Sequence, residues 1–153
     1  HALLKPGGKL LVEFRNALFS LFTFNRYTHD FIVDDLLKDV TKPIRDKVSE
    51  SLQGICRMDM PPVRDVAPDG SGPGYDLIQA KFHNPLELPD LLGKSGFGEI
   101  KNHWYHFHAA PPMLSDLLGD ALDEESMKLE HGGTDDWRGN FLCSAVLVEA
   151  AAL

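Results

Sequence analysis

Three histidines lie close together in the segment His103-Trp104-Tyr105-His106-Phe107-His108. Side chains of an extended strand alternate between its two faces, so His106 and His108 are expected on the same face. Two imidazoles placed in this way can share a metal ion. A third ligand at a matching spacing is not evident, because His83 and His131 are remote in sequence and no cysteine lies close. We therefore expect no metal site and interpret His106 and His108 as packing or substrate-facing residues. A His-x-His metal-dependent enzyme stays an alternative.

The composition indicates a single domain, because 153 residues with 43% hydrophobic side chains can bury one sizeable core. The 23 acidic side chains outnumber the 15 basic ones, and the net charge of -8 repels phosphate backbones. Nucleic acid is therefore not an expected partner. The sequence shows neither an apolar run of the roughly 20 residues that span a bilayer nor the pattern of a signal peptide, so we expect no membrane partner and a cytoplasmic location. Cys56 and Cys143 are too far apart for a zinc knuckle or a disulfide framework.

The elements that position the histidines begin with the segment HALLKPGGKLLVEFRN. Pro6 fixes one backbone angle, and Gly7 and Gly8 can adopt positive φ, so a turn is predicted there. The apolar run from Leu10 to Phe14 predicts a strand buried on both faces of a parallel sheet.

A lid-like helical insertion is predicted over about residues 16–58, directly after the first strand. Asn16 can cap a first helix, a second carries apolar residues between Phe31 and Val40, and a third has Thr41 as N-cap with Pro43 in its first turn. An exposed loop rich in Pro, Gly and Asp follows over about residues 59–75.

The second half of the chain is predicted to alternate strands with helices. The expected elements are a short strand over Leu77–Phe82, a helix from Asn84 to Gly93 or Gly96, a strand over Ile100–His108, an acidic helix over Met113–Glu130 and a strand over Asn140–Ala150.

The turn Leu4-Lys5-Pro6-Gly7-Gly8 and the later segment HNPLELPDLLGKSGF together resemble the C-terminal half of a class I S-adenosylmethionine-dependent methyltransferase. In that family the Leu-Lys-Pro-Gly-Gly turn precedes the fifth strand of a seven-stranded sheet. The resemblance implies an α/β fold, namely part of a Rossmann-like sheet with a helical insertion after the first strand present. It also implies that the closing strand runs antiparallel between the strands near Leu10 and Trp104.

The family's cofactor motifs are a Gly-rich loop and an acidic strand end, and both precede the matched turn. The remaining glycine cluster, DGSGPG at 69–74, contains proline and follows no buried strand. The resemblance therefore implies that S-adenosyl-L-methionine is bound mainly by an N-terminal half outside this sequence, and the cofactor-binding residues here are unknown. We expect this portion alone to be inactive.

The implied topology places several polar residues at one rim, since ligands of open α/β sheets bind at the carboxyl ends of the parallel strands. Candidate catalytic residues are His29 and His108. Candidate substrate-binding residues are Glu13, Arg15, Asn16, Asn25, Arg26, Tyr27, His106, Trp137 and Arg138. Each also has a structural interpretation: Glu13 can pair with Arg15, Arg26 and Tyr27 can anchor the insertion, Trp137 can pack, and Arg138 can pair with Asp135 or Asp136.

The function that we expect is transfer of a methyl group to a small-molecule acceptor. A non-catalytic interaction domain is the alternative from another class. In the family's sheet the strand Leu10–Phe14 has neighbours on both sides. We therefore expect that the N-terminal half or a second copy of the chain covers its open edge, or that the sheet is rearranged.

Overall fold

The computed structural model describes residues 3–77, 81–133 and 135–153, which form two compact units. The first unit comprises the described residues of 1–22 and 82–153, and the second those of 23–81. The second unit overlaps the predicted helical insertion and loop. Within the described ranges, no helix is both long enough and apolar enough to cross a membrane.

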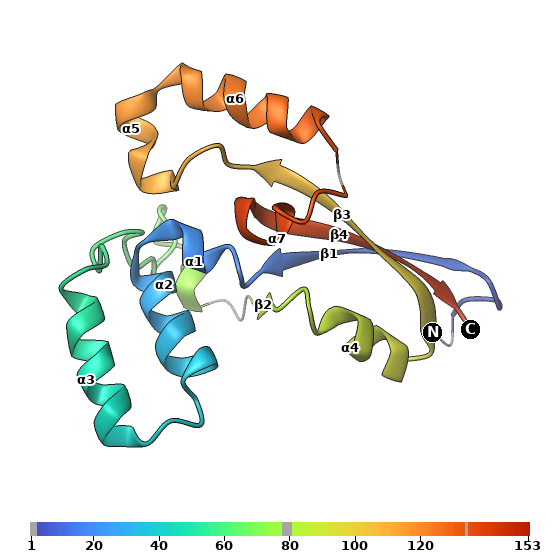
Figure 1. The fold of residues 1–153 in the computed structure, drawn as a ribbon, viewed down its shortest axis with the longest axis horizontal. Coiled ribbons are helices and arrows are strands. Elements are labelled where there is room, and N and C mark those ends of the chain that lie inside the picture. Colours follow the sequence, from blue (N-terminus) through green and yellow to red (C-terminus); the bar gives the residue numbers. More distant parts are fainter. Residues whose placement is uncertain (1–2, 78–80, 134) are drawn as a thin grey trace. The chain divides into compact units, whose positions relative to one another are not determined.

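A mixed sheet of four strands forms the centre of the first unit (Figure 1). The strands are β1 (Lys9–Asn16), β2 (Phe82–His83), β3 (Phe97–Phe107) and β4 (Cys143–Ala152), and their order is β2-β1-β4-β3. Because β4 is antiparallel to both β1 and β3, these two strands are parallel to each other. The predicted antiparallel closing strand is thereby confirmed. The described part of the sheet has four strands and not the seven of a complete family sheet.

The core of the first unit lies on one face of this sheet. Val146 and Val148 of β4 are fully buried and pack with Leu88 and Leu92 of α4 (Leu88–Lys94). Both α4 and α6 (Asp120–His131) contact β3 (Figure 1). Apolar residues that recur on one side of β4 thus explain why the helices cover that face.

The prediction that Leu10–Phe14 is buried on both faces is wrong for the described chain. Leu10, Val12 and Phe14 pack against the core, whereas Leu11 on the opposite face is 62% exposed. β1 is therefore a half-buried strand, with one face on the core and the other exposed. Among the described residues, β2 pairs with β1 only at Arg15 and Asn16, so the β1 edge from Lys9 to Phe14 carries no strand.

The structure also differs from the strand that was predicted over Leu77–Phe82. Tyr75–Leu77 forms a single 3-10 turn, and only Phe82–His83 is a strand. The part of the prediction that falls on residues 78–80 lies outside the described residues. β3 begins at Phe97, three residues before the predicted start, because Phe97 and Gly98 pair with the end of β4.

The helices of the second half are shorter than predicted. The expected acidic helix becomes a 3-10 turn (Pro112–Leu114), α5 (Ser115–Leu118) and α6, with a break at Gly119, whose φ is 54°. The segment from Asn84 first makes a turn, and α4 begins at Leu88. A short helix, α7 (Gly139–Leu142), precedes β4 where the sequence predicted a strand.

The second unit is mainly helical. After α1 (Ser20–Thr23) at its boundary come α2 (Arg26–Asp30), a π-helix (Phe31–Leu36) and α3 (Lys42–Gln53). Thr41 is the N-cap of α3 with Pro43 in the first turn, as predicted.

Candidate functional site

Asn16 ends β1 and holds the chain around the carboxyl end of that strand. The side chain is fully buried, and its Nδ2 donates to the carbonyl oxygens of Asn140 and Cys143, both at 2.8 Å. Its Oδ1 accepts from the Leu18 N–H at 3.0 Å. These bonds give Asn16 a structural role, because they join β1 to α7 and to the start of β4. A substrate contact by Asn16 stays a prediction.

His106 near the end of β3 has an unusual backbone conformation, with a φ of 57°. Non-glycine residues rarely adopt this left-handed region, since Cβ then approaches the carbonyl oxygen. The His106 N–H donates to Oε2 of Glu130 on α6 at 3.0 Å, which supports this conformation. The regular alternation of β3 therefore does not apply to His106.

A pocket of about 320 Å³ lies between this end of β3 and α6. We call it the β3–α6 pocket, and its walls combine imidazole, carboxylate and hydroxyl groups with apolar surface. The lining residues are His106, Phe107, His108, Leu122, Asp123, Ser126, Met127 and Glu130. His106 and His108, which the sequence singled out, thus line one cavity.

His108 lies just beyond β3, where its backbone N–H donates to the Leu142 carbonyl at 2.9 Å. Its imidazole contacts the Phe19 ring, with centroids 4.7 Å apart. Burial, and then the proximity of His106, lower the pKa of His108 below its ordinary value. A neutral imidazole can take up a proton, which is the property required of a general base.

Glu13 and Arg15 contact groups on the sheet itself. Burial, followed by the interaction of its hydroxyl with Glu13, raises the pKa of Tyr105 to about 12. The Arg15 guanidinium lies over the Phe82 ring, 4.8 Å from its centroid. The predicted pairing of Glu13 with Arg15 stays a prediction. Substrate binding by either residue stays a prediction.

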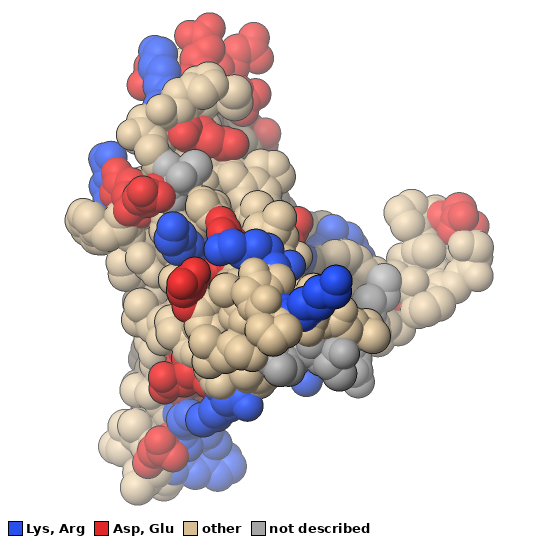
Figure 2. Space-filling model, turned by 90° about the vertical axis from the view of Figure 1, so that its right-hand side faces the viewer, with Lys and Arg blue, Asp and Glu red and all other residues tan. Residues whose placement is uncertain are grey.

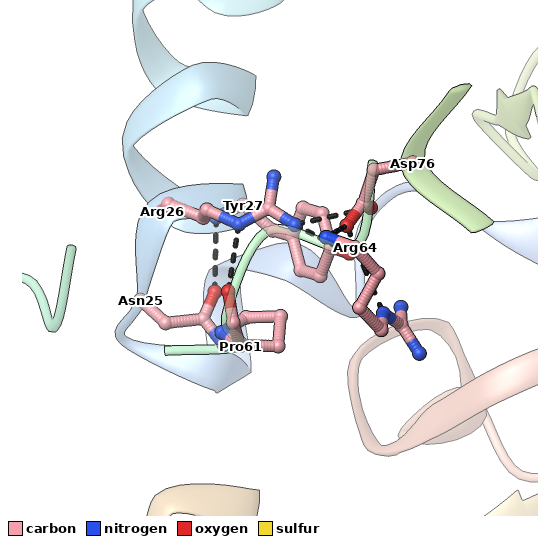
Figure 3. A network of polar contacts seen from close by, with 6 residues as sticks. All are labelled: Asn25, Arg26, Tyr27, Pro61, Arg64 and Asp76. Atoms are coloured by element: carbon pink, nitrogen blue, oxygen red, sulfur yellow. Dashed lines mark hydrogen bonds and ion pairs between the residues drawn. The ribbon is translucent and has the colours of Figure 1, made fainter. Parts of the chain in front are cut away.

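The candidates Asn25, Arg26 and Tyr27 belong to one network in the second unit (Figure 3). Arg26 donates through Nε to the Pro61 carbonyl at 2.9 Å and through Nη2 to Asp76 at 3.1 Å. The same guanidinium lies over the Tyr27 ring, 4.5 Å from its centroid. Asn25 caps α2 by accepting from the Tyr27 N–H at 2.9 Å.

Asp76 is the second centre of this network. It accepts from the Arg64 backbone N–H at 2.5 Å, and this bond, together with Arg26, lowers the pKa of Asp76. Both Arg26 and Asp76 are mostly buried. The anchoring role predicted for Arg26 and Tyr27 is therefore supported by contacts between segments distant in sequence.

His29 is buried between α2 and α3. Its Nδ1 lies 2.8 Å from Oδ1 of Asp30, and its Nε2 lies 2.9 Å from the Ser49 hydroxyl. Both ring nitrogens are thus engaged within the second unit. Proton transfer to His29 requires the Ser49 bond to rearrange, so the predicted catalytic role stays a prediction.

Trp137 and Arg138 precede α7. Arg138 pairs with Asp136, with its Nε and Nη2 at 2.8 and 2.5 Å from Oδ2, which confirms the expected local ion pair. This pairing lowers the pKa of Asp136 and raises that of Arg138. Trp137 is 70% exposed, and its ring contacts Phe141. Trp137 therefore packs against Phe141 with only a small part of its side chain, and most of the indole is exposed.

The DGSGPG segment at 69–74 does not fit a nucleoside cofactor. The DGSGPG segment is exposed except for Gly72 and Gly74, and Asp69 binds Ser71 within its own turn. No long strand leads into this turn, and only the 3-10 turn Tyr75–Leu77 follows it, so the segment lacks the strand-to-helix arrangement whose backbone N–H groups hold such ligands. In the described ranges, no group of three or more His, Cys, Asp and Glu side chains is placed to hold a metal ion.

Sequence reasoning missed the α6 wall of the pocket. The helix was predicted, but Asp123, Ser126, Met127 and Glu130 were assigned no site role. Their spacing of three or four residues places them on one face of a helix, and this was the available signal. Which element that face meets depends on the tertiary fold.

Comparison of the chain with models of protein families, with curated proteins and with solved structures gave no match.

Proposed function

We propose that the chain is the C-terminal, acceptor-side portion of an S-adenosylmethionine-dependent methyltransferase that acts on a small-molecule acceptor. The observation that carries the proposal is the placement of the Pro6-Gly7-Gly8 turn before β1, in a sheet where β4 lies antiparallel between β1 and β3. This strand order is the one that the family resemblance implies.

The turn itself supports the proposal, because its glycines are required by the backbone. Gly7 has a φ of 74°, and a Cβ on Gly8 would lie 2.8 Å from the Lys5 carbonyl oxygen. The Gly7 N–H donates to the Ala152 carbonyl at 2.8 Å, and the Ala152 N–H donates to the Gly8 carbonyl at 2.9 Å. The motif thus joins the start of β1 to the end of β4.

The β3–α6 pocket is the proposed acceptor site. It lies at the carboxyl end of a parallel strand, where open α/β sheets bind ligands. His108 supplies a neutral imidazole that can accept a proton from the acceptor. Phe107 and Met127 supply apolar surface against which an acceptor can pack.

The cofactor is assigned to chain that precedes this portion, since the family's cofactor motifs precede the matched turn and the DGSGPG segment does not replace them. Binding of S-adenosylmethionine, measured by titration calorimetry, tests this assignment. We expect the full-length protein to bind and residues 1–153 alone to give no heat, with folding of the fragment verified by circular dichroism. A clear micromolar signal from the fragment would contradict the assignment, and no binding by the full-length protein would contradict the proposed function.

The open edge of β1 favours a second candidate, a non-catalytic interaction domain. An unpaired strand edge next to the exposed Leu11 can add a strand from a partner. The candidates differ in one measurement: the interaction domain predicts a full-length protein that associates through this edge but neither binds nor consumes S-adenosylmethionine. Both proposals expect the open edge of β1 to be covered, either by a second copy of the chain or by a segment that precedes it.

A further inference from the structure

The charges around the β3–α6 pocket have one sign. Asp123 and Glu130 line it, and no lysine or arginine does so among its lining residues. The helix α6 carries five carboxylates and one lysine, and that lysine, Lys128, binds Glu125. Figure 2 shows acidic side chains gathered in the upper part of the view, where α5 and α6 lie. A cation entering this pocket is therefore attracted, whereas an anion is repelled.

The two carboxylates of the pocket retain capacity to bind a ligand. Glu130 uses Oε2 to accept from the His106 N–H, and no bond to its Oε1 occurs within the part of the chain that the structure describes. Asp123 likewise has no hydrogen bond to the described residues. Carboxylate oxygens form their strongest hydrogen bonds with charged N–H donors.

Apolar surface completes the walls. Phe107 is buried at the carboxyl end of β3, while Leu122 and Met127 come from α6. Ser126 is already committed, since its hydroxyl donates to the Leu122 carbonyl and accepts from the Ala109 N–H. A ligand that matches these walls combines an apolar body with a cationic head, whereas a sugar would leave the apolar surface without a partner.

We propose that the β3–α6 pocket binds a small organic amine in its ammonium form, with the ammonium group at Asp123 and Glu130 and the hydrocarbon part against Phe107, Leu122 and Met127. Binding of an amine is inferred from the walls and charges of the pocket. The inference rests on the proposed function only where it treats the bound amine as the methyl acceptor. It narrows the acceptor class from any small molecule to amines, whose ammonium nitrogen gives a proton to the neutral His108 imidazole before its lone pair can take the methyl group.

Met127 provides a direct probe of binding that does not depend on methyl transfer. In the NMR spectrum of the full-length protein, the ε-methyl signal of Met127 can be assigned with a Met127→Leu variant. Three probes share a phenyl-ethyl body: phenethylammonium, phenethyl alcohol and hydrocinnamate. We expect millimolar phenethylammonium to shift the Met127 signal, the alcohol to bind more weakly and the carboxylate to bind most weakly.

Charge-neutralising variants locate the ammonium group. Asp123→Asn and Glu130→Gln should each weaken phenethylammonium binding by about fivefold, since each removes one charge-assisted contact. Glu130→Gln keeps an oxygen that can accept from the His106 N–H. Glu124→Gln is the matched control, because Glu124 is exposed on the same helix and does not line the pocket. Binding by this control should change less than twofold.

Three outcomes would overturn the inference: no Met127 shift with any probe, hydrocinnamate binding as tightly as phenethylammonium, or equal loss with Glu124→Gln and Asp123→Asn. These outcomes leave cofactor binding by the full-length protein unaffected. Conversely, amine binding without any S-adenosylmethionine binding would keep the pocket assignment and remove the proposed function.

Discussion

The backbone N–H of His106 donates to Oε2 of Glu130 at 3.0 Å, which joins β3 to α6 at a residue whose φ is 57°. A non-glycine residue in this region costs about 1 kcal/mol, and the hydrogen bond helps to offset that cost. The pair thus sets the geometry of one end of the β3–α6 pocket.

The strain at His106 can be measured by comparing alanine with glycine. We expect His106→Gly to be at least as stable as His106→Ala, because glycine adopts positive φ without a Cβ clash. At His103, which lies in regular pairing with β4, the Gly variant should be about 1 kcal/mol less stable than the Ala variant. Urea unfolding of the four variants gives both differences. An equal glycine penalty at both positions would contradict the assigned backbone strain.

Asn16 should be intolerant of an isosteric carboxylate. Asn16→Asp replaces a fully buried amide that donates to two carbonyl oxygens at 2.8 Å by a group that faces the same oxygens without a donor. We expect a loss of about 3 kcal/mol in the free energy of unfolding at neutral pH. Asn140→Asp is the control, since its amide makes a single bond to the Trp137 carbonyl, and it should cost less than about 1 kcal/mol. Similar costs for the two variants would argue against the structural role of Asn16.

Tyr105 should ionise late in an alkaline titration. Its pKa in the folded chain is raised to about 12, first by burial and then by the interaction with Glu13, whereas an ordinary tyrosine ionises near pH 10. Because the folded pKa is the higher one, the stabilisation is complete below about pH 10 and is lost as the pH rises towards 12. Phenolate absorbance of the three tyrosines should show a late component that Tyr105→Phe removes and Tyr27→Phe retains.

Glu13→Gln separates the two causes of the Tyr105 shift. It should lower the pKa of Tyr105 only in part, because burial is the larger cause and remains. A complete return to the ordinary value would show that Glu13, and not burial, dominates.

His108 should be neutral when the proposed acceptor binds at pH 7. Its pKa is lowered by burial and by His106, so protonation destabilises the folded chain. For a depressed histidine pKa, this stabilisation is present above the ordinary value near pH 6.5 and is lost as the pH falls through the folded pKa. Histidine NMR titration, assigned with His108→Asn, should place His108 below that ordinary value. In His106→Asn the pKa of His108 should rise slightly, since only the smaller cause is removed, and a titration at or above 6.5 in the unsubstituted chain would contradict the assignment.

Local sequence signals determined the elements whose causes are local. Pro6-Gly7-Gly8 predicted the turn before β1, because glycine adopts the φ of 74° at Gly7 without a Cβ clash. Thr41 and Pro43 predicted the start of α3, since proline suits the first turn of a helix. The order of β1, β4 and β3 followed from the family resemblance and not from periodicity.

Burial and the site were decided by contacts between distant residues. The apolar run Leu10–Phe14 could not show that one face of β1 packs on the core while Leu11 is exposed, because burial depends on what lies opposite. The partners of Asn16 are 124 and 127 positions away, and Arg26 meets Asp76 at a separation of 50.

The β3–α6 pocket likewise combines features that the sequence predicted with contacts that only the tertiary structure decided. The sequence by itself determined that His106 and His108 lie near the end of a strand and that an acidic helix follows. Only the tertiary structure brought Glu130 to the His106 backbone, because helix periodicity specifies which residues share a face and not which strand that face contacts.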